Sequence, residues 1–218
     1  RDSRVDGTRR LAEALAKLES PPGTLVCASA TGFYGDRGDE VLTEQSEAGT
    51  GFLAEVCQEW EAAAGPARDA GIRVVHVRLG VVLSPKGGAL QKMLLPFKLG
   101  GGGVIGSGQQ YWSWVTLDDA AAIFVRAATD RSVEGPVNAV APNPVTNREF
   151  TKTLAGVLHR PAIIPMPAFA ARLALGEMAD ELLLSSARVE PGQLMAAGYT
   201  FRYPELEGAL RHLLGRQQ

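Results

Sequence analysis

Two glycine patterns in the sequence have the form of phosphate-binding loops. Gly101, Gly103 and Gly106 lie in the G-x-G-x-x-G spacing of dinucleotide-binding turns. A turn of that kind follows a strand and opens a helix, because the helix N-terminus then faces the pyrophosphate. Here residues 87–98 upstream have a helical pattern, and the downstream segment favours a loop and then a strand. We therefore do not expect this loop to bind phosphate.

The second pattern runs from Thr31 to Gly35 and directly follows an apolar, strand-like run at 24–29. Its position is that of a nucleotide-binding turn, but no helical pattern starts directly after Gly35. Acidic residues follow instead, and their charges would repel a pyrophosphate: Asp36, Asp39, Glu40, Glu44 and Glu47. This segment is not predicted to hold phosphate either.

Metal and thiol chemistry find little support in the sequence. The three histidines are isolated and lack the spacing of metal ligands, so no metal site is predicted. His76 lies within the apolar run RVVHVRL and is predicted to pack inside a strand. Cys27 and Cys57 lie in an apolar run and a helical pattern respectively, and we expect both to be buried, reduced thiols.

Composition narrows the class of protein. The chain has 218 residues, 45% of them hydrophobic and 21% charged, which is typical of a globular fold with a substantial core. A net charge of −2 gives no basic footprint for nucleic acid. No apolar run approaches the length of a membrane span, and the chain opens on a charged, helical segment rather than a signal peptide. We therefore expect a cytoplasmic protein without nucleic-acid or membrane partners.

Hydrophobic periodicity predicts alternating helices and strands. The expected strands cover 24–29, 72–84, 111–117 and 135–141, and the expected helices cover 4–18, 51–71, 87–100, 118–130 and 204–214. Thr146 and Glu149 have capping-box spacing and predict the start of a further helix. The predicted inner faces are Val5, Leu11, Leu15 and Leu18 for the first helix, and Phe52, Val56, Trp60 and Ala63 for the second. The connections are long enough to join parallel strands.

Several segments, in this order along the chain, carry a resemblance to a known family. Together they resemble the extended short-chain dehydrogenase/reductase superfamily, which contains the nucleotide-sugar epimerases, and more narrowly its atypical epimerase-like family with a DUF1731-type C-terminal extension. The resemblance covers essentially the whole chain. The segments are DSRVDGTRRL, SATGFYGD, FLAEVCQEWEAAA, VRLGVVLSPKGGAL, MLLPFKLGGGGVIGSGQQYWSWVTLDD, VNAVAPNPVTNREF and VEPGQLMAAGYTFRYPELEGAL.

The resemblance implies an α/β fold with an incomplete, Rossmann-type, doubly wound parallel sheet and a smaller helix-rich C-terminal substrate lobe. We assign 1–85 and 115–141 to the sheet part, and 86–114 and 142–218 to the lobe. The implied cofactor is NADP or NAD. In that family the phosphate loop follows the first strand, and no matching loop is found here. The resemblance therefore predicts that the nucleotide-binding part is absent and that this chain alone binds the cofactor poorly.

The resemblance also suggests site residues. Standard members use a Ser or Thr, a Tyr and a Lys four residues after the Tyr, but the matching helix carries Phe52 and Val56, which cannot exchange a proton. Candidate catalytic residues are then Ser29, Thr31 and Tyr34, at the end of the strand before that helix. The alternative is that these hydroxyls only cap the strand end and pack the loop.

The implied cofactor contacts are Arg4, Arg78, Gly80 and Val82, where Gly80 would allow close approach of the backbone. The implied substrate contacts are Gln110, Tyr111 and Trp112, and the preceding glycine stretch is expected to form a flexible rim of the substrate cleft. Two functions remain open. One is an NAD(P)-dependent epimerase or oxidoreductase acting on a small or nucleotide-linked substrate. The other is a catalytically silent, NADP-binding sensor or scaffold.

Overall fold

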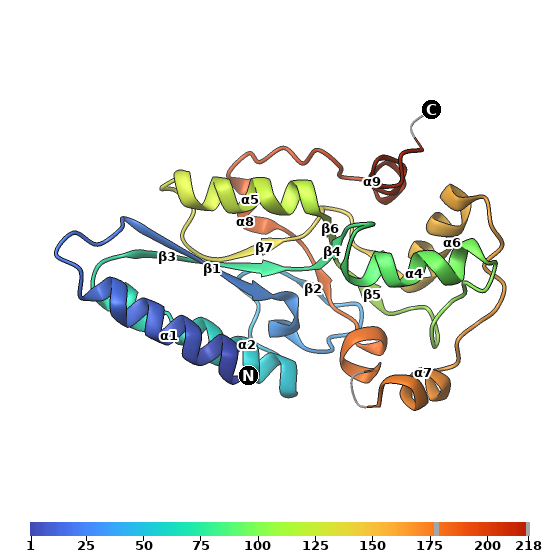
Figure 1. Ribbon diagram of the computed structural model, residues 1–218, viewed down its shortest axis with the longest axis horizontal. Coiled ribbons are helices and arrows are strands. Elements are labelled where there is room, and N and C mark those ends of the chain that lie inside the picture. Colours follow the sequence, from blue (N-terminus) through green and yellow to red (C-terminus); the bar gives the residue numbers. More distant parts are fainter. Residues whose placement is uncertain (177–178, 217–218) are drawn as a thin grey trace.

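Three parallel strands form the central sheet of the computed structural model, which describes residues 1–176 and 179–216 (Figure 1). The strands are β1 (Thr24–Ala30), β3 (Arg73–Leu79) and β7 (Gly135–Ala139), in the order β1-β3-β7. The register pairs Ala30 with Leu79, and Leu79 with Ala139. The carboxyl ends of all three strands therefore lie at one edge of the sheet.

Helices cover both faces of this sheet (Figure 1). On one face lie α1 (Asp2–Ala16), α2 (Phe52–Ala62) and α3 (Gly65–Asp69); on the other lie α5 (Leu117–Thr129) and α8 (Gly192–Ala196). Each face has its own apolar core. Cys27 and Val74 pack towards α1 and α3, whereas Val75 and Val77 pack towards α5 and α8. This arrangement confirms the predicted α/β class with a doubly wound parallel sheet.

A smaller, helix-rich lobe lies beyond the carboxyl edge of the sheet (Figure 1). Its helices are α4 (Gly88–Lys98), α6 (Asn147–Leu158), α7 (Ala168–Leu175) and α9 (Leu206–Leu213). Two short strand pairs join it to the sheet part: β4 (Val81–Leu83) runs parallel to β6 (Trp114–Thr116), and β5 (Tyr111–Trp112) antiparallel to β8 (Val145–Thr146). Trp114, Phe150 and Leu210 are fully buried in its core.

The C-terminal extension does not stay in this lobe. After the π-helix η2 (Asp180–Leu184), strand β9 (Arg188–Val189) pairs in parallel with β2 (Val41–Leu42), and Leu194 enters the core beneath β7 and α5. The carboxylate of Asp119, at the start of α5, accepts hydrogen bonds from the backbone N–H groups of Arg202 and Tyr203. Part of 142–218 thus packs on the sheet part, to which the sequence analysis did not assign it.

Most predicted elements are present within a few residues of their expected bounds. The capping box at Thr146 and Glu149 forms as predicted, Cys27 and Cys57 are free and buried, and His76 is buried within β3. Two predicted strands are divided. The run 72–84 breaks at Gly80, where pairing passes from β7 to β6; a Cβ at this position would lie 2.5 Å from the carbonyl oxygen of Ser113. The run 111–117 breaks at Ser113 into β5 and β6.

Two predicted helix faces are wrong in part. Leu11 in α1 and Leu18 just beyond its end are each 50% exposed, while Ala12 is fully buried against β1 and α3. In α2, Phe52 is 59% exposed, although Val56 and Ala63 are buried as predicted. The prediction assigned large apolar residues to the inner faces of these helices. In the structure small alanines make the closest contacts between the helices and the sheet. No helix in the described ranges is both long and apolar enough to cross a membrane.

The glycine stretch is also not the flexible cleft rim that we expected. Its backbone is bonded to the segment before α7: the Gly106 N–H donates to Met166, and the Met166 N–H donates to Val104. A Cβ on Gly103 would lie 1.7 Å from the carbonyl oxygen of Ile164. These glycines allow two chain segments to pack backbone to backbone, and they do not line the cavity described below.

Candidate functional site

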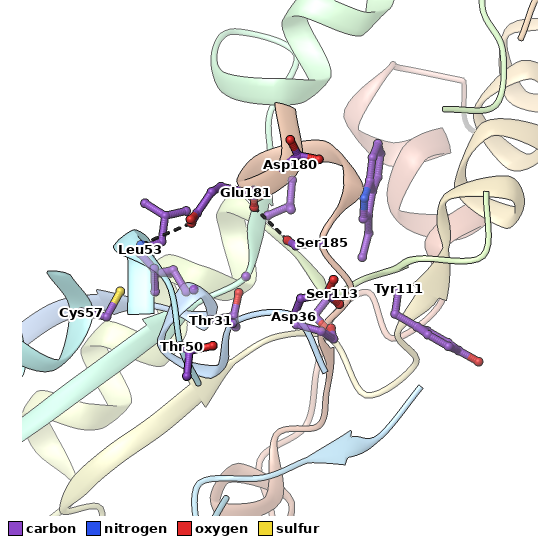
Figure 2. Close-up of a pocket in the computed structure, with 18 residues that line it drawn as sticks. Thr31, Asp36, Thr50, Leu53, Cys57, Tyr111, Ser113, Asp180, Glu181 and Ser185 are labelled. Carbon is purple, nitrogen blue, oxygen red and sulfur yellow. Dashed lines mark hydrogen bonds between the residues drawn. The ribbon is translucent and has the colours of Figure 1, made fainter. Parts of the chain in front are cut away.

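A cavity of about 390 Å³ opens at the carboxyl edge of the parallel sheet (Figure 2). We call it the edge pocket. Its floor is formed by the end of β1, the following 3-10 helix η1 (Thr31–Tyr34), the end of β3 and the first turn of α2. The floor residues are mostly small: Ala30, Thr31, Gly32, Leu53, Cys57, Leu79 and Gly80. Ligands of open α/β sheets bind at this edge, so the position is that of a ligand site.

The opposite wall comes from the lobe and the C-terminal extension (Figure 2). It contains Tyr111, Trp112 and Ser113, together with Asp180, Glu181, Ser185 and Ala187. The carboxylate of Glu181 accepts a hydrogen bond of 3.2 Å from the backbone N–H of Leu53, in the first turn of α2. Since Gly51 at the start of α2 has no side chain, Glu181 serves as the cap of that helix.

The lining of the edge pocket is acidic. Asp36, Asp180 and Glu181 line it, and no Lys, Arg or His is among its described lining residues. Asp180 is paired with the exposed Arg172 at 2.8 Å. Asp36 and Glu181 have backbone N–H groups as their hydrogen-bond donors. Cys57 is not a candidate nucleophile, because burial raises the pKa of its thiol.

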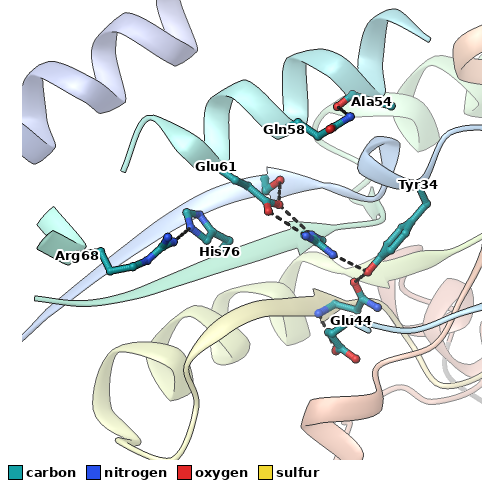
Figure 3. Close-up of polar contacts among 10 residues, drawn as sticks. Tyr34, Glu44, Ala54, Gln58, Glu61, Arg68 and His76 are labelled. Atoms are coloured by element: carbon teal, nitrogen blue, oxygen red, sulfur yellow. Dashed lines mark hydrogen bonds and ion pairs between the residues drawn. The ribbon is translucent and has the colours of Figure 1, made fainter. Parts of the chain in front are cut away.

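A buried polar network is centred on Arg78, and Figure 3 shows its partners Glu61 and Tyr34. The Arg78 guanidinium donates to both carboxylate oxygens of Glu61, at 2.8 and 2.9 Å, and to the Tyr34 hydroxyl at 2.9 Å. Ser29 donates to the same carboxylate at 2.7 Å. Burial disfavours the charge of Arg78, but the interactions with Glu61 and Tyr34 together outweigh burial and raise the pKa of Arg78. A charge-assisted, bidentate pair of this kind fixes both side chains.

The network continues through Tyr34 to the C-terminal extension (Figure 3). The Tyr34 hydroxyl donates to the Asn138 side chain at 2.7 Å. The Asn138 backbone N–H donates to Glu44, whose second oxygen accepts from the N–H of Gln193. Burial raises the pKa of Tyr34, and the neighbouring Arg78 offsets part of that rise. Tyr34 is therefore a neutral, fully buried hydrogen-bonding link.

The structure brings four of the residues suggested by the sequence to the edge pocket: Thr31, Gly80, Tyr111 and Trp112. It places Ser29, Tyr34 and Arg78 in the buried network and not in the lining. Gly80 permits close packing against Ser113, as described above.

Three further suggested contacts lie elsewhere. The Gln110 side chain is buried and donates to the carbonyls of Ile105 and Leu183. Val82 lies within β4, paired with Val115. The Arg4 guanidinium stacks on the Trp60 ring, 4.7 Å from its centroid, near the far end of α2 from the pocket. None of the three is in the pocket lining. Their proposed contacts with cofactor or substrate stay predictions.

Comparison with known protein families decides the family. The model of the NAD dependent epimerase/dehydratase family matches residues 2–140, and a domain of unknown function, DUF1731, matches residues 166–213. The chain belongs to the NAD dependent epimerase/dehydratase family. Because the match covers 2–140, it does not support the expectation that the nucleotide-binding part is absent, nor the expected poor binding of the cofactor.

Relatives of this epimerase-family chain are found in distant organisms. An epimerase family protein of Mycobacterium bovis is 44% identical over 216 residues, covering 99% of this chain and 71% of that protein. The crystal structure of the human epimerase family protein SDR39U1 with NADPH has a TM-score of 0.93 and 37% identity, covering 99% of this chain and 73% of that one. The crystal structure of a nucleoside-diphosphate sugar epimerase from Corynebacterium glutamicum has a TM-score of 0.84 and 43% identity. That match covers 100% of this chain and 43% of the other chain.

The family implies a nicotinamide dinucleotide, and the edge pocket fits one end of it. Small floor residues leave space against the strand ends, and the buried indole N–H of Trp112, in the pocket wall, has no acceptor within the described part of the chain. A nicotinamide and ribose bring acceptors and no negative charge. A pyrophosphate does not fit this lining, since carboxylates face it without a cation. The fit is thus to the nicotinamide end.

Sequence reasoning missed Asp180, Glu181 and Ser185 as residues of the candidate site. Their signal was weak: two acids interrupt an apolar stretch, ahead of the small residues Ser185 and Ser186. Such a pattern is usual for a solvated helix face. Only the return of the extension across the sheet edge brings these residues opposite Thr31, about 150 positions away along the chain.

Proposed function

We propose that this chain is an NADPH-dependent oxidoreductase of the epimerase type, acting on a small or nucleotide-linked substrate held in the edge pocket. The observation that carries the proposal is the position of that pocket, at the carboxyl edge of a parallel sheet and between two structural parts. Family membership and the NADPH in the structure of the human relative support the same cofactor.

The roles of the pocket residues follow from their positions. When bound, the cofactor supplies or accepts a hydride. Thr31 would donate a hydrogen bond to the substrate oxygen, and Trp112 would hold the substrate from the opposite wall. Ser29, Tyr34 and Arg78 act as positioning residues, because their network fixes the strand ends and η1 that form the pocket floor.

The decisive measurement has two parts. NADPH binding to the full chain is followed by the fluorescence of the cofactor, and transfer of deuterium from one face of labelled NADPH to a panel of aldehydes and ketones is followed by mass spectrometry. We expect binding and stereospecific transfer. Thr31→Val should reduce the rate by roughly 100-fold, the effect of losing one donor to the reacting oxygen. Thr153→Val is the matched control, because Thr153 is half-buried on α6 and outside the pocket lining. Absence of NADPH binding would overturn the proposal.

A second candidate function is a silent NADP-binding sensor or scaffold. One observation favours it: α2 presents an exposed Phe52 and a buried Val56 where the superfamily relay would supply a proton. The same measurements separate the two functions. NADPH binding without transfer to any carbonyl favours the sensor, and stereospecific turnover excludes it.

A further inference from the structure

We propose that the edge pocket selects a substrate whose reacting part carries a positive charge, such as an ammonium group beside a carbonyl or hydroxyl, and that it rejects carboxylate- or phosphate-bearing groups there. This inference rests on the proposed function, because it names the substrate class of the same pocket. It narrows the choice between a small and a nucleotide-linked substrate, since a diphosphate would meet the acidic wall.

The charges around the pocket carry the first part of the argument. Asp36 approaches from the loop after η1, and Glu181 approaches from the C-terminal extension. Asp36 accepts from the backbone N–H groups of Gly38 and Ser186, at 3.3 and 3.1 Å. Neutral N–H donors orient a carboxylate but do not cancel its charge. Both groups therefore act on whatever enters the pocket.

Three guanidiniums near the pocket do not line it. Arg78 is paired with Glu61 in the buried network. Arg172 forms an ion pair with Asp180, so the charge of that carboxylate is compensated. Arg188 lies over the ring of Tyr111, 5.2 Å from its centroid. Its contact with a lining residue is therefore with an aromatic ring and not with a carboxylate. Asp36 and Glu181 are left as the charges in the lining that have no ion-pair partner among the described residues. The resulting field favours a cation.

The aromatic wall carries the second part. Tyr111 and Trp112 line the pocket on the side opposite to the strand ends. The Tyr111 ring points away from the pocket (Figure 2) and has Arg188 over it, so Trp112 supplies the aromatic side chain of this wall. Aromatic rings attract ammonium groups, and an aromatic residue combined with carboxylates is a common means of ammonium recognition. Trp112 is only 7% exposed, so its ring is held rigidly in the wall, and its buried N–H has no acceptor in the described structure. A cation within a small molecule would satisfy both the carboxylates and this ring.

Glu181 also caps α2, so a test must separate charge from structure. Glu181→Gln removes the charge, but the oxygen of the new amide can still accept the hydrogen bond from the Leu53 N–H. A Cβ on Gly51 would lie 3.3 Å from the Glu181 carboxylate, so this side chain packs closely against the start of α2. Glu134→Gln is the matched control, because Glu134 is exposed and outside the lining.

The probes are three benzyl alcohols that differ at the para position: a trimethylammonio group, a tert-butyl group of the same shape, and a carboxylate. Their binding to the full chain is measured calorimetrically, with and without NADPH, with which the alcohols cannot react. We expect the cationic probe to bind about tenfold more tightly than its neutral isostere and the carboxylate about tenfold more weakly, with smaller differences at high salt. Glu181→Gln should remove most of this discrimination, and Glu134→Gln none.

Equal binding of the three probes, tighter binding of the carboxylate, or no binding of any probe would overturn the inference. Failure of the proposed function has a different signature. In that case NADPH fails to bind in a parallel titration, whatever the order of the three probes.

Discussion

At the residue scale, Arg78 illustrates how burial decides the role of a charged side chain. The family resemblance suggests Arg78, at the end of an apolar strand, as a cofactor contact. In the structure Ser29, Arg78 and Asn138 occupy one row across the sheet, and the guanidinium has partners for all three of its nitrogens. Glu61, seventeen positions earlier, supplies the opposite charge. The Arg78 side chain is 5% exposed and the Glu61 side chain 13%, so this pair lies mostly inside the protein.

We predict that Arg78→Met lowers the free energy of unfolding by about 3–5 kcal/mol, because Glu61 is left as a buried charge without its partner. Urea unfolding followed by circular dichroism measures the change. Arg211→Met is the control: Arg211 forms an exposed pair with Glu207 on α9, and its loss should cost less than about 1 kcal/mol. Similar losses in the two variants would contradict a buried, structural role for Arg78.

At the element scale, local patterns could be predicted and long-range contacts could not. The capping box at Thr146 needs residues within one helical turn, and it forms as predicted. The inner faces of α1 and α2 depend on which neighbours pack there, so Leu11 and Phe52 were misplaced. The candidate site shows the same limit. Thr31, Tyr111 and Trp112 could be predicted from the resemblance, but Glu181 reaches the pocket through the path of the extension.

The glycine stretch allows a prediction about backbone packing. Gly103→Ala should destabilise the protein by about 1–3 kcal/mol, because the new Cβ would collide with the carbonyl oxygen of Ile164 and force two segments apart. Gly101→Ala is a close control, since its Cβ would lie 3.5 Å from the Pro96 oxygen and its backbone does not require positive φ. Thermal unfolding compares the two. If Gly101→Ala costs as much as Gly103→Ala, the collision with Ile164 does not explain the loss, because a Gly→Ala change without a collision should not destabilise the protein.

At the scale of the whole molecule, the two parts are joined by more than the chain connections between them. Leu194, from the C-terminal extension, is buried with Val77 and Val137 of the sheet. Asp119 binds the backbone at Arg202 and Tyr203, and Glu44 binds the backbone at Gln193. The edge pocket exists only where these contacts hold the extension against the sheet edge. Stability of the extension and shape of the pocket are therefore coupled.

This coupling predicts that the protein unfolds in one cooperative transition. In a Trp60→Phe background the remaining tryptophans, Trp112 and Trp114, report on the lobe, while circular dichroism reports on all helices. Leu194→Ala should lower the free energy of unfolding by about 2–5 kcal/mol, because it leaves a cavity beneath α5 and β7. Since the lobe depends on the same extension, both urea midpoints should shift equally. Met195→Ala, at an exposed neighbouring position, should leave both midpoints unchanged. Separate midpoints for the two signals would mean that the lobe folds independently of the sheet, and the pocket wall would then be free to move.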